Sequence, residues 1–194
     1  VVDPRYSDSA SVLADDWIAL RPGTDAALVA GMAHVMITED LHDQEFLDKY
    51  CVGFDEEHMP EGAPENASYR SYIEGKGEDG IEKTPEWAAE ITGVPANKIR
   101  TFAREVALAK PANIAQGWGP QRHANGENNA NAIYLLAALT GNVGIPGGGT
   151  GGREGYLWPY TPWLADGVNP VETSISCYKW TDAIDRGPEL TAAR

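Results

Sequence analysis

Residues 112–141 have the sequence ANIAQGWGPQRHANGENNANAIYLLAALTG, which predicts a strand, a turn and a helix in succession. The short apolar segment 112–116 is typical of a strand, and glycine-rich polar residues follow it. The helix, at about 126–140, is apolar nearly all round, so we expect it to be central and buried. Gly141 is expected to end this helix.

The sequence upstream has the same order of elements. Residues 1–2 and 17–20 are short apolar runs, and each leads into a turn that contains proline. Thr24 is expected to be the N-cap of a helix with one apolar face, and a second helix is expected from Asp43. The residues expected to face inward are Leu28, Val29, Met32, Val35 and Met36 in the first helix, and Phe46, Leu47 and Tyr50 in the second.

Residues 84–93 and 95–109 are predicted to form a helical hairpin. Thr84 is expected to be an N-cap, with Pro85 at the first helical position and Gly93 at the end of the first helix.

The alternation of strands and helices predicts an α/β fold, with a Rossmann-like parallel sheet covered by flanking helices. Residues 1–150 are predicted to form a partial nucleotide-binding domain, with a loop-rich insertion at about 52–83. Glycine, proline and aromatic residues dominate 151–194, which is expected to be an irregular C-terminal arm.

Composition limits the class of function. The chain has 194 residues and a net charge of −14, which argues against a general nucleic-acid binder because phosphate backbones need basic surfaces. Cys51 and Cys177 are too few for a four-cysteine cluster, and no apolar run has the roughly 18 residues of a membrane span. The chain begins without Met, inside an apolar run and with no visible signal peptide, so we interpret it as an internal part of a longer protein.

Two turns that follow predicted strands carry acidic side chains. Asp3, in Val2-Asp3-Pro4-Arg5, is placed to accept hydrogen bonds from a ribose or base, although a purely turn-forming Asp-Pro explains it equally well. In Arg21-Pro22-Gly23-Thr24-Asp25, the glycine lets a ligand approach the backbone, and the Asp25 carboxylate matches the paired donors of guanine. The alternative is that Asp25 only complements the helix dipole.

The third turn, at 116–126, is the most polar of the three. Arg122 is suited to grip a phosphate or pterin carbonyl with two hydrogen bonds, and Trp118 to stack on a flat ring. His123 alone is more often structural than a ligand. Polar groups at this density are costly unless a ligand or partner satisfies them. The glycine run at 147–152 matches the dinucleotide fingerprint G-x-G-x-x-G only formally, because it follows a helix and not a strand, so no NAD site is implied.

Four stretches occur in a distinctive order, namely 2–8 (VDPRYSD), 21–28 (RPGTDAAL), 116–122 (QGWGPQR) and 139–144 (LTGNVG). Together they resemble the dimethyl sulfoxide reductase family of molybdopterin enzymes. Tracts 116–126 and 181–189 (TDAIDRGPE) are most similar to the catalytic A subunits of the anaerobic members. The resemblance covers nearly all of the chain.

The resemblance implies a bis(molybdopterin guanine dinucleotide) molybdenum cofactor. It assigns Asp3 and Asp25 to the guanosine part, with Arg5, Gly23 and Thr24 as neighbours. It places Trp118, Gln121 and Arg122 near the pterin and molybdenum. Gly117, Gly119 and His123 are included as cofactor-binding residues, and no residue of this chain is expected to be a metal ligand.

The resemblance also implies an enzyme that removes oxygen from dimethyl sulfoxide or a related S-oxide or N-oxide, as the terminal step of anaerobic respiration. Its expected partners are further domains of the same subunit, carrying a 4Fe-4S cluster, together with an iron–sulfur subunit and a membrane anchor at the periplasmic face. The chain alone is expected to be inactive. Polysulfide, tetrathionate or selenate reductases, a non-catalytic nucleotide-binding module and a purely structural domain stay open as alternatives.

Overall fold

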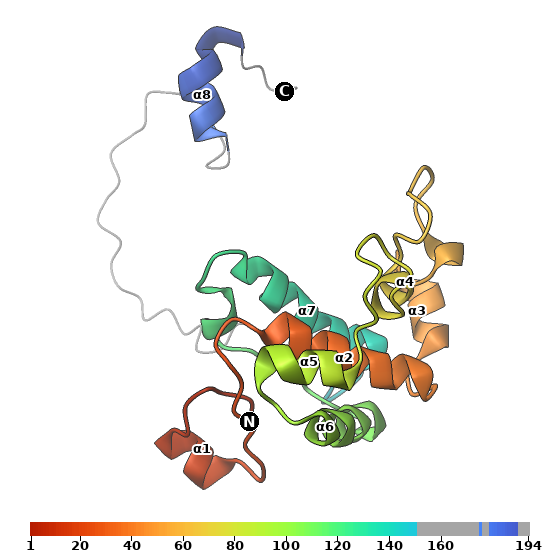
Figure 1. Ribbon diagram of the computed structural model, residues 1–194, viewed down its shortest axis with the longest axis vertical. Helices are drawn as coiled ribbons and strands as arrows, with labels where there is room; N and C mark the ends of the chain where they lie inside the picture. Colours follow the sequence, from red (N-terminus) through yellow and green to blue (C-terminus); the bar gives the residue numbers. More distant parts are fainter. Residues whose placement is uncertain (151–174, 176–178, 190–194) are drawn as a thin grey trace. The chain divides into compact units, whose positions relative to one another are not determined.

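The computed structural model of the chain describes residues 1–150, 175 and 179–189. It divides into two compact units, Val1–Tyr156 and Leu157–Arg194. The helices of the first unit are α1 (Asp8–Leu13), α2 (Asp25–Thr38), α3 (Gln44–Tyr50), α4 (Tyr69–Ile73), α5 (Pro85–Thr92), α6 (Ala96–Leu108) and α7 (Gly126–Leu139), with 3-10 helices η1 (Glu56–His58) and η2 (Gly119–Gln121) (Figure 1). The second unit contains α8 (Trp180–Arg186) and the 3-10 helix η3 (Gly187–Glu189).

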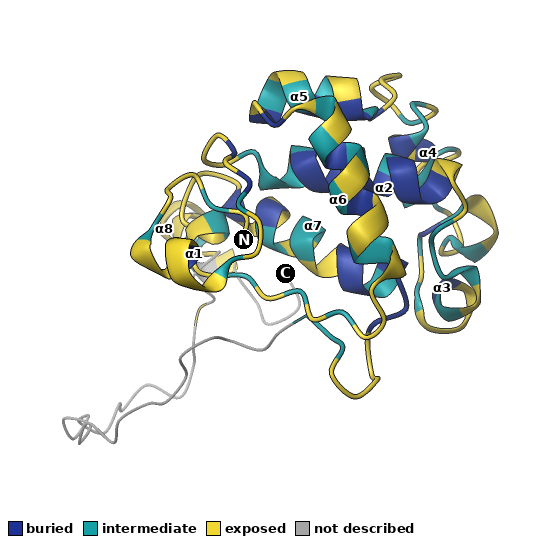
Figure 2. Ribbon diagram, turned by 90° about the horizontal axis from the view of Figure 1, so that it is seen from below, coloured by how far each residue is buried: buried dark blue, intermediate teal, exposed yellow. Residues whose placement is uncertain are grey.

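Helix α2 is the centre of the first unit and contacts α4, α5, α6 and α7 (Figure 1). From Leu28 to Ile37 its sequence is apolar except for His34, so it can be covered on every side. Figure 2 shows α2 largely in the colour of buried residues, whereas α6 has an exposed outer face. All five residues predicted to face inward from this helix are buried, which confirms that part of the sequence analysis.

Helix α7 was expected to be the central helix, and that expectation is wrong. Tyr134 and Leu135 of α7 are 40% and 43% exposed, so one side of this helix is uncovered in the described residues. Its opposite side packs on α2 through Leu136 and Leu139, which are 6% and 3% exposed. An all-round apolar sequence therefore does not distinguish the middle helix of the unit from a peripheral one.

The predicted Rossmann-like parallel sheet is also wrong, because the described residues contain no sheet. The expected strands pair only through isolated parallel bridges, Val2 with Ile18 and Asn113 with Gly149. The segment around Asn113 therefore does not pair with either of the first two, and no ladder of hydrogen bonds builds up. Ile18 and Leu20 of the second segment join the helical core instead, at 5% and 6% exposure, whereas Val1 and Val2 of the first segment are 58% and 37% exposed.

Local sequence signals set the ends of the helical hairpin as predicted. Thr84 accepts a hydrogen bond from the Trp87 amide at 3.2 Å, Pro85 follows at the first helical position, and Gly93 ends α5 with a φ of 77°. Helix α3 likewise begins after Asp43, whose carboxylate caps it. The inward prediction for α3 is only partly confirmed, since Leu47 is 4% exposed but Tyr50 is 64% exposed.

Residues 52–83, the expected insertion, contain η1 and α4 and are closed by a buried lysine. The Lys83 side chain is 1% exposed, and its ammonium donates to Asp79 at 2.8 Å and to the Ile81 carbonyl. It also lies 4.2 Å from the centroid of the Tyr72 ring. Because a buried charge must be compensated by partners, these contacts hold the end of the segment against the helices.

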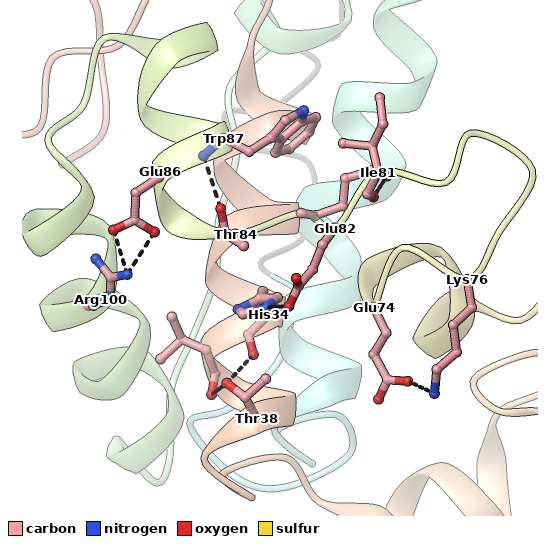
Figure 3. A network of polar contacts seen from close by, with 12 residues as sticks. His34, Thr38, Glu74, Lys76, Ile81, Glu82, Thr84, Glu86, Trp87 and Arg100 are labelled. Atoms are coloured by element: carbon pink, nitrogen blue, oxygen red, sulfur yellow. Dashed lines mark hydrogen bonds and ion pairs between the residues drawn. The ribbon is translucent and has the colours of Figure 1, made fainter.

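Figure 3 shows the ion pairs around this segment and the hairpin. His34 Nε2 lies 2.7 Å from Glu82 Oε1, and Arg100 pairs with Glu86 at 2.7 Å. Both carboxylates are more than half exposed, and pairs of this kind contribute about 0–1 kcal/mol. Packing on α2 therefore dominates the stability of this region.

The C-terminal arm predicted at 151–194 lies mostly outside the described residues. Its described part includes the short helix α8, in which Lys179 Nζ lies 3.2 Å from Asp182. None of the helices in the described residues is long and apolar enough to cross a membrane.

Candidate functional site

A cleft of about 780 Å³ lies within the first unit. Its walls come from residues 1–4, 20–25 and 112–123, with apolar side chains of α2, α6 and α7 behind them. Six predicted site residues line it, namely Asp3, Gly23, Asp25, Gly117, Gly119 and His123. The other five, Arg5, Thr24, Trp118, Gln121 and Arg122, are not part of its lining. The three predicted turns therefore meet at one cleft, although no sheet aligns them.

The first turn is held by hydrogen bonds of Asp3. One carboxylate oxygen accepts from the Arg5 amide at 2.7 Å, and the Asp3 carbonyl accepts from Trp17 Nε1 at 2.9 Å. The carboxylate is thus already used to form the turn, as the structural interpretation of Asp-Pro expected. Asp3 also lines the cleft. Arg5 is exposed and outside the lining.

The second turn is anchored to the end of α5. The Arg21 guanidinium donates to the carbonyls of Glu90 and Ile91 at 2.7 and 3.0 Å. Thr24 occupies the N-cap position of α2, but its hydroxyl donates to the Arg21 carbonyl at 2.6 Å and does not cap the helix. Gly23 has a φ of +78°, a conformation that L side chains rarely adopt. Glycine therefore suits this position of the turn, which lines the cleft.

Asp25 is the half-buried acid of the cleft. Burial raises the pKa of its carboxyl group, and neither the hydrogen bond from its own amide nor the charge of His123 offsets that effect. Among the described residues no other side chain donates a hydrogen bond to it. The His123 ring lies beside Gly23, 3.5 Å from where a β-carbon on that glycine would lie. Asp25 is thus a partly desolvated carboxylate in the first turn of α2, at the wall of the cleft.

The third turn winds through η2 into α7. Gly126 packs directly on the backbone of Gln121, since a β-carbon there would lie 2.4 Å from the Gln121 carbonyl oxygen. Outside the cleft lining, the guanidinium carbon of Arg122 lies 5.0 Å above the Trp118 ring, a cation–π contact. Trp118 is 48% exposed, and in the described part of the chain Arg122 makes no ion pair. Arg122 is therefore not fixed by a structural salt bridge.

Two residues that the sequence analysis did not select also belong to this site. Gln116 Nε2 donates to the Ala130 carbonyl at 3.0 Å, which leaves Gln116 Oε1 buried at the cleft without a partner in the described residues. Asn129 is 7% exposed and connects α7 to two of the turns. A polar side chain buried in a largely apolar helix was the signal that could have identified Asn129.

A group of titratable side chains away from the cleft is held by its own contacts. Ligand atoms of Asp48, Asp55 and His58 lie within 4.8 Å of one another. The hydrogen bond that the His58 ring donates to the Asp55 carboxylate raises the pKa of His58. Burial would raise the pKa of Asp55, but hydrogen bonds from His58 and Gln44 lower it further than burial raises it. These pairings account for the group without a metal.

Comparison with known proteins gives a consistent result. The family model for molybdopterin oxidoreductase matches residues 1–180. Dimethyl sulfoxide reductase DmsA of Escherichia coli is 61% identical over 197 residues, which cover 100% of this chain and 24% of that protein. A trimethylamine-N-oxide reductase of Vibrio parahaemolyticus is 40% identical over 148 residues, 76% of this chain and 16% of that protein. Acetylene hydratase from Pelobacter acetylenicus is similar in structure, with a TM-score of 0.57 and 34% identity over 73% of this chain and 17% of that chain.

The chain thus spans about a quarter of the length of the DmsA relatives it matches. The family implies a molybdenum–molybdopterin cofactor. The match along 1–180 and the identity over the whole chain confirm the resemblance seen in the sequence. The chain belongs to the molybdopterin oxidoreductase family.

Proposed function

We propose that this chain binds the guanosine portion of a bis(molybdopterin guanine dinucleotide) cofactor in an enzyme that reduces dimethyl sulfoxide or a related S-oxide or N-oxide. The observation that carries the proposal is the cleft, which gathers Asp3, Asp25 and the turn at 117–123 in a chain that is 61% identical to a dimethyl sulfoxide reductase. Neither the fold nor the family alone selects this reaction, because a hydratase shares the scaffold.

The chemistry of the cleft fits a flat ligand rich in hydrogen-bond donors. Asp25 offers a half-buried carboxylate, and Gln116 Oε1 is a buried acceptor without a partner in the described residues. The N1–H and N2–H₂ edge of guanine carries two parallel donors. Gly117 and Gly119 line the cleft, and the space where a β-carbon of Gly119 would lie is open, which leaves room for a ring or phosphate to approach there.

In this proposal each turn has its own role. Asp3 and Asp25 accept hydrogen bonds from the guanosine, with Arg5, Gly23 and Thr24 beside them. Gly117, Gly119 and His123 contribute cleft surface. Trp118, Gln121 and Arg122 face the pterin and the molybdenum centre, where Arg122 can donate two parallel hydrogen bonds to a phosphate or a carbonyl. When bound, the cofactor supplies the two-electron oxygen-transfer chemistry.

The remaining features of the proposed enzyme rest on the family resemblance seen in the sequence. Residues 1–150 form the cofactor-binding part with the insertion at 52–83, and 151–194 extend from it. Further domains of the subunit carry a 4Fe-4S cluster, and an iron–sulfur subunit and a membrane anchor complete the complex. The complex acts at the periplasmic face of the membrane.

Metal and nucleotide analysis of the purified full-length enzyme tests the proposal. We expect molybdenum together with GMP released by acid hydrolysis, and dye-linked reduction of dimethyl sulfoxide or trimethylamine N-oxide. GMP without molybdenum would indicate a non-catalytic nucleotide-binding module. Turnover of polysulfide, tetrathionate or selenate in place of the oxides would move the enzyme to another reductase of the same scaffold.

A further inference from the structure

Asn129 connects two turns of the cleft that are far apart in the sequence. Its side-chain oxygen accepts from the Ala26 amide at 3.0 Å. Its side-chain nitrogen donates to the carbonyls of Gly23 and Pro120 at 3.4 and 3.3 Å. Gly23 belongs to the turn of Asp25, and Pro120 belongs to the turn at 116–126. One buried amide thus binds both turns at once.

The bond to Ala26 replaces a missing helix cap. The first amides of a helix have no partner within the helix and are usually satisfied by the side chain of the N-cap residue. Thr24 occupies that position in α2 but makes no capping bond. Asn129 satisfies one of these amides from α7 instead, so the start of α2 depends on its position relative to α7.

Helix stability does not explain an asparagine here. Asparagine is a poor residue for a helix interior, and all three side-chain bonds of Asn129 leave its own helix. We propose that Asn129 is a positioning residue that fixes the spacing between the turn of Asp25 and the turn of Trp118 and Arg122, and thereby the spacing at which cofactor is held. This inference rests on the proposed function.

The test uses two variants of Asn129 in the full-length enzyme. Asn129→Asp keeps one oxygen as an acceptor for the Ala26 amide, but it replaces the donor nitrogen with a second oxygen that faces the two carbonyls. Asn129→Ala removes all three bonds. Both variants should release GMP-bearing cofactor on the order of tenfold faster than the wild type, measured as GMP per folded protein against time after gel filtration. Asn129→Asp has nearly the shape of the native residue, so it carries the test should Asn129→Ala fail to fold.

Ser68→Ala is the matched control. Ser68 is 0% exposed and caps α4, none of whose residues line the cleft. This control should lower the melting temperature of the apoprotein and leave cofactor retention unchanged. Combining Asn129→Asp with Asp25→Asn should give a less than additive loss of retention, because both act on one turn.

Wild-type retention in both Asn129 variants, with only the melting temperature lowered, would overturn this inference alone. Absence of molybdenum and GMP from the wild-type enzyme would overturn the proposed function and this inference with it.

Discussion

Replacing Asp25 with asparagine should weaken cofactor binding without harming the fold. The substitution keeps the shape of the side chain but places an amide donor where the proposal has an acceptor for the guanine edge. Two donors that face each other leave at least one buried group unpaired, which costs about 1–3 kcal/mol. At about 1.4 kcal/mol per tenfold change, retention should fall roughly 5- to 150-fold.

The same Asp25→Asn substitution should not lower the stability of the apoprotein, although it weakens cofactor binding. Because burial raises the pKa of Asp25, the folded chain binds this proton more tightly than the unfolded chain. The free energy of unfolding therefore falls as pH rises from the ordinary value of 3.8 through the pKa of the folded state. Asparagine carries no charge, so the Asp25→Asn apoprotein should be at least as stable as the wild type at pH 7, with the difference shrinking toward pH 3.8.

The assay is the amount of molybdenum and GMP that survives stringent washing, beside thermal unfolding of the apoprotein at several pH values. Asp8→Asn is the control, since Asp8 also lies in the first turn of a helix but is outside the cleft lining. Equal molybdenum and GMP contents in wild type and Asp25→Asn would refute the assignment. A lower apoprotein stability at pH 7 would contradict the view of Asp25 as a desolvated carboxylate.

Arg122→Lys should lower the activity per bound molybdenum, and it should change the free energy of unfolding by less than about 1 kcal/mol because Arg122 is exposed. A large loss of stability with normal specific activity would contradict this. The 194-residue chain alone should show no oxide reduction with reduced dye and added cofactor, and measurable turnover would refute its dependence on the rest of the enzyme. Met36→Ala, at a side chain 0% exposed, should cost about 2–5 kcal/mol in urea unfolding, and a cost below about 1 kcal/mol would show that the core adjusts around α2. Because the pKa of His58 is raised, its pairing with Asp55 stabilises the fold below pH 6.5, and this stabilisation is lost as pH rises through the pKa of the folded state. Asp55→Asn should therefore return the pKa of His58, measured by NMR titration, toward 6.5.

The features predicted correctly from the sequence are those that depend on residues close together in the chain. The Thr84 cap, Pro85 and the stop at Gly93 lie within one helix and its flanks, so their geometry depends little on the rest of the chain. The five residues expected to face inward from α2 are buried, but α2 is buried on every side and not on the single apolar face that was expected. The four motifs that indicated the family are also local, and the comparisons confirmed the family.

The sequence also selected three turns that the structure gathers at one cleft, although the reason given for their meeting was wrong. A parallel sheet was expected to align them, but the segments that contain Val2, Ile18 and Asn113 make only isolated bridges. A short apolar run does not show whether its residues belong to a strand or pack against helices, and Val1 and Val2 are not even buried.

The sequence by itself therefore determined helices α2, α3, α5, α6 and α7, the cap at Thr84, the polar turns and the family. Tertiary structure alone decided that α2 and not α7 is central, and that Thr24 leaves the cap of α2 to Asn129. It also decided that Gln116 Oε1 is buried without a partner among the described residues. The physical reason is separation along the chain. The bond from Ala26 to Asn129 spans 103 residues, and such contacts depend on which surfaces meet when the helices pack, which neither periodicity nor composition specifies.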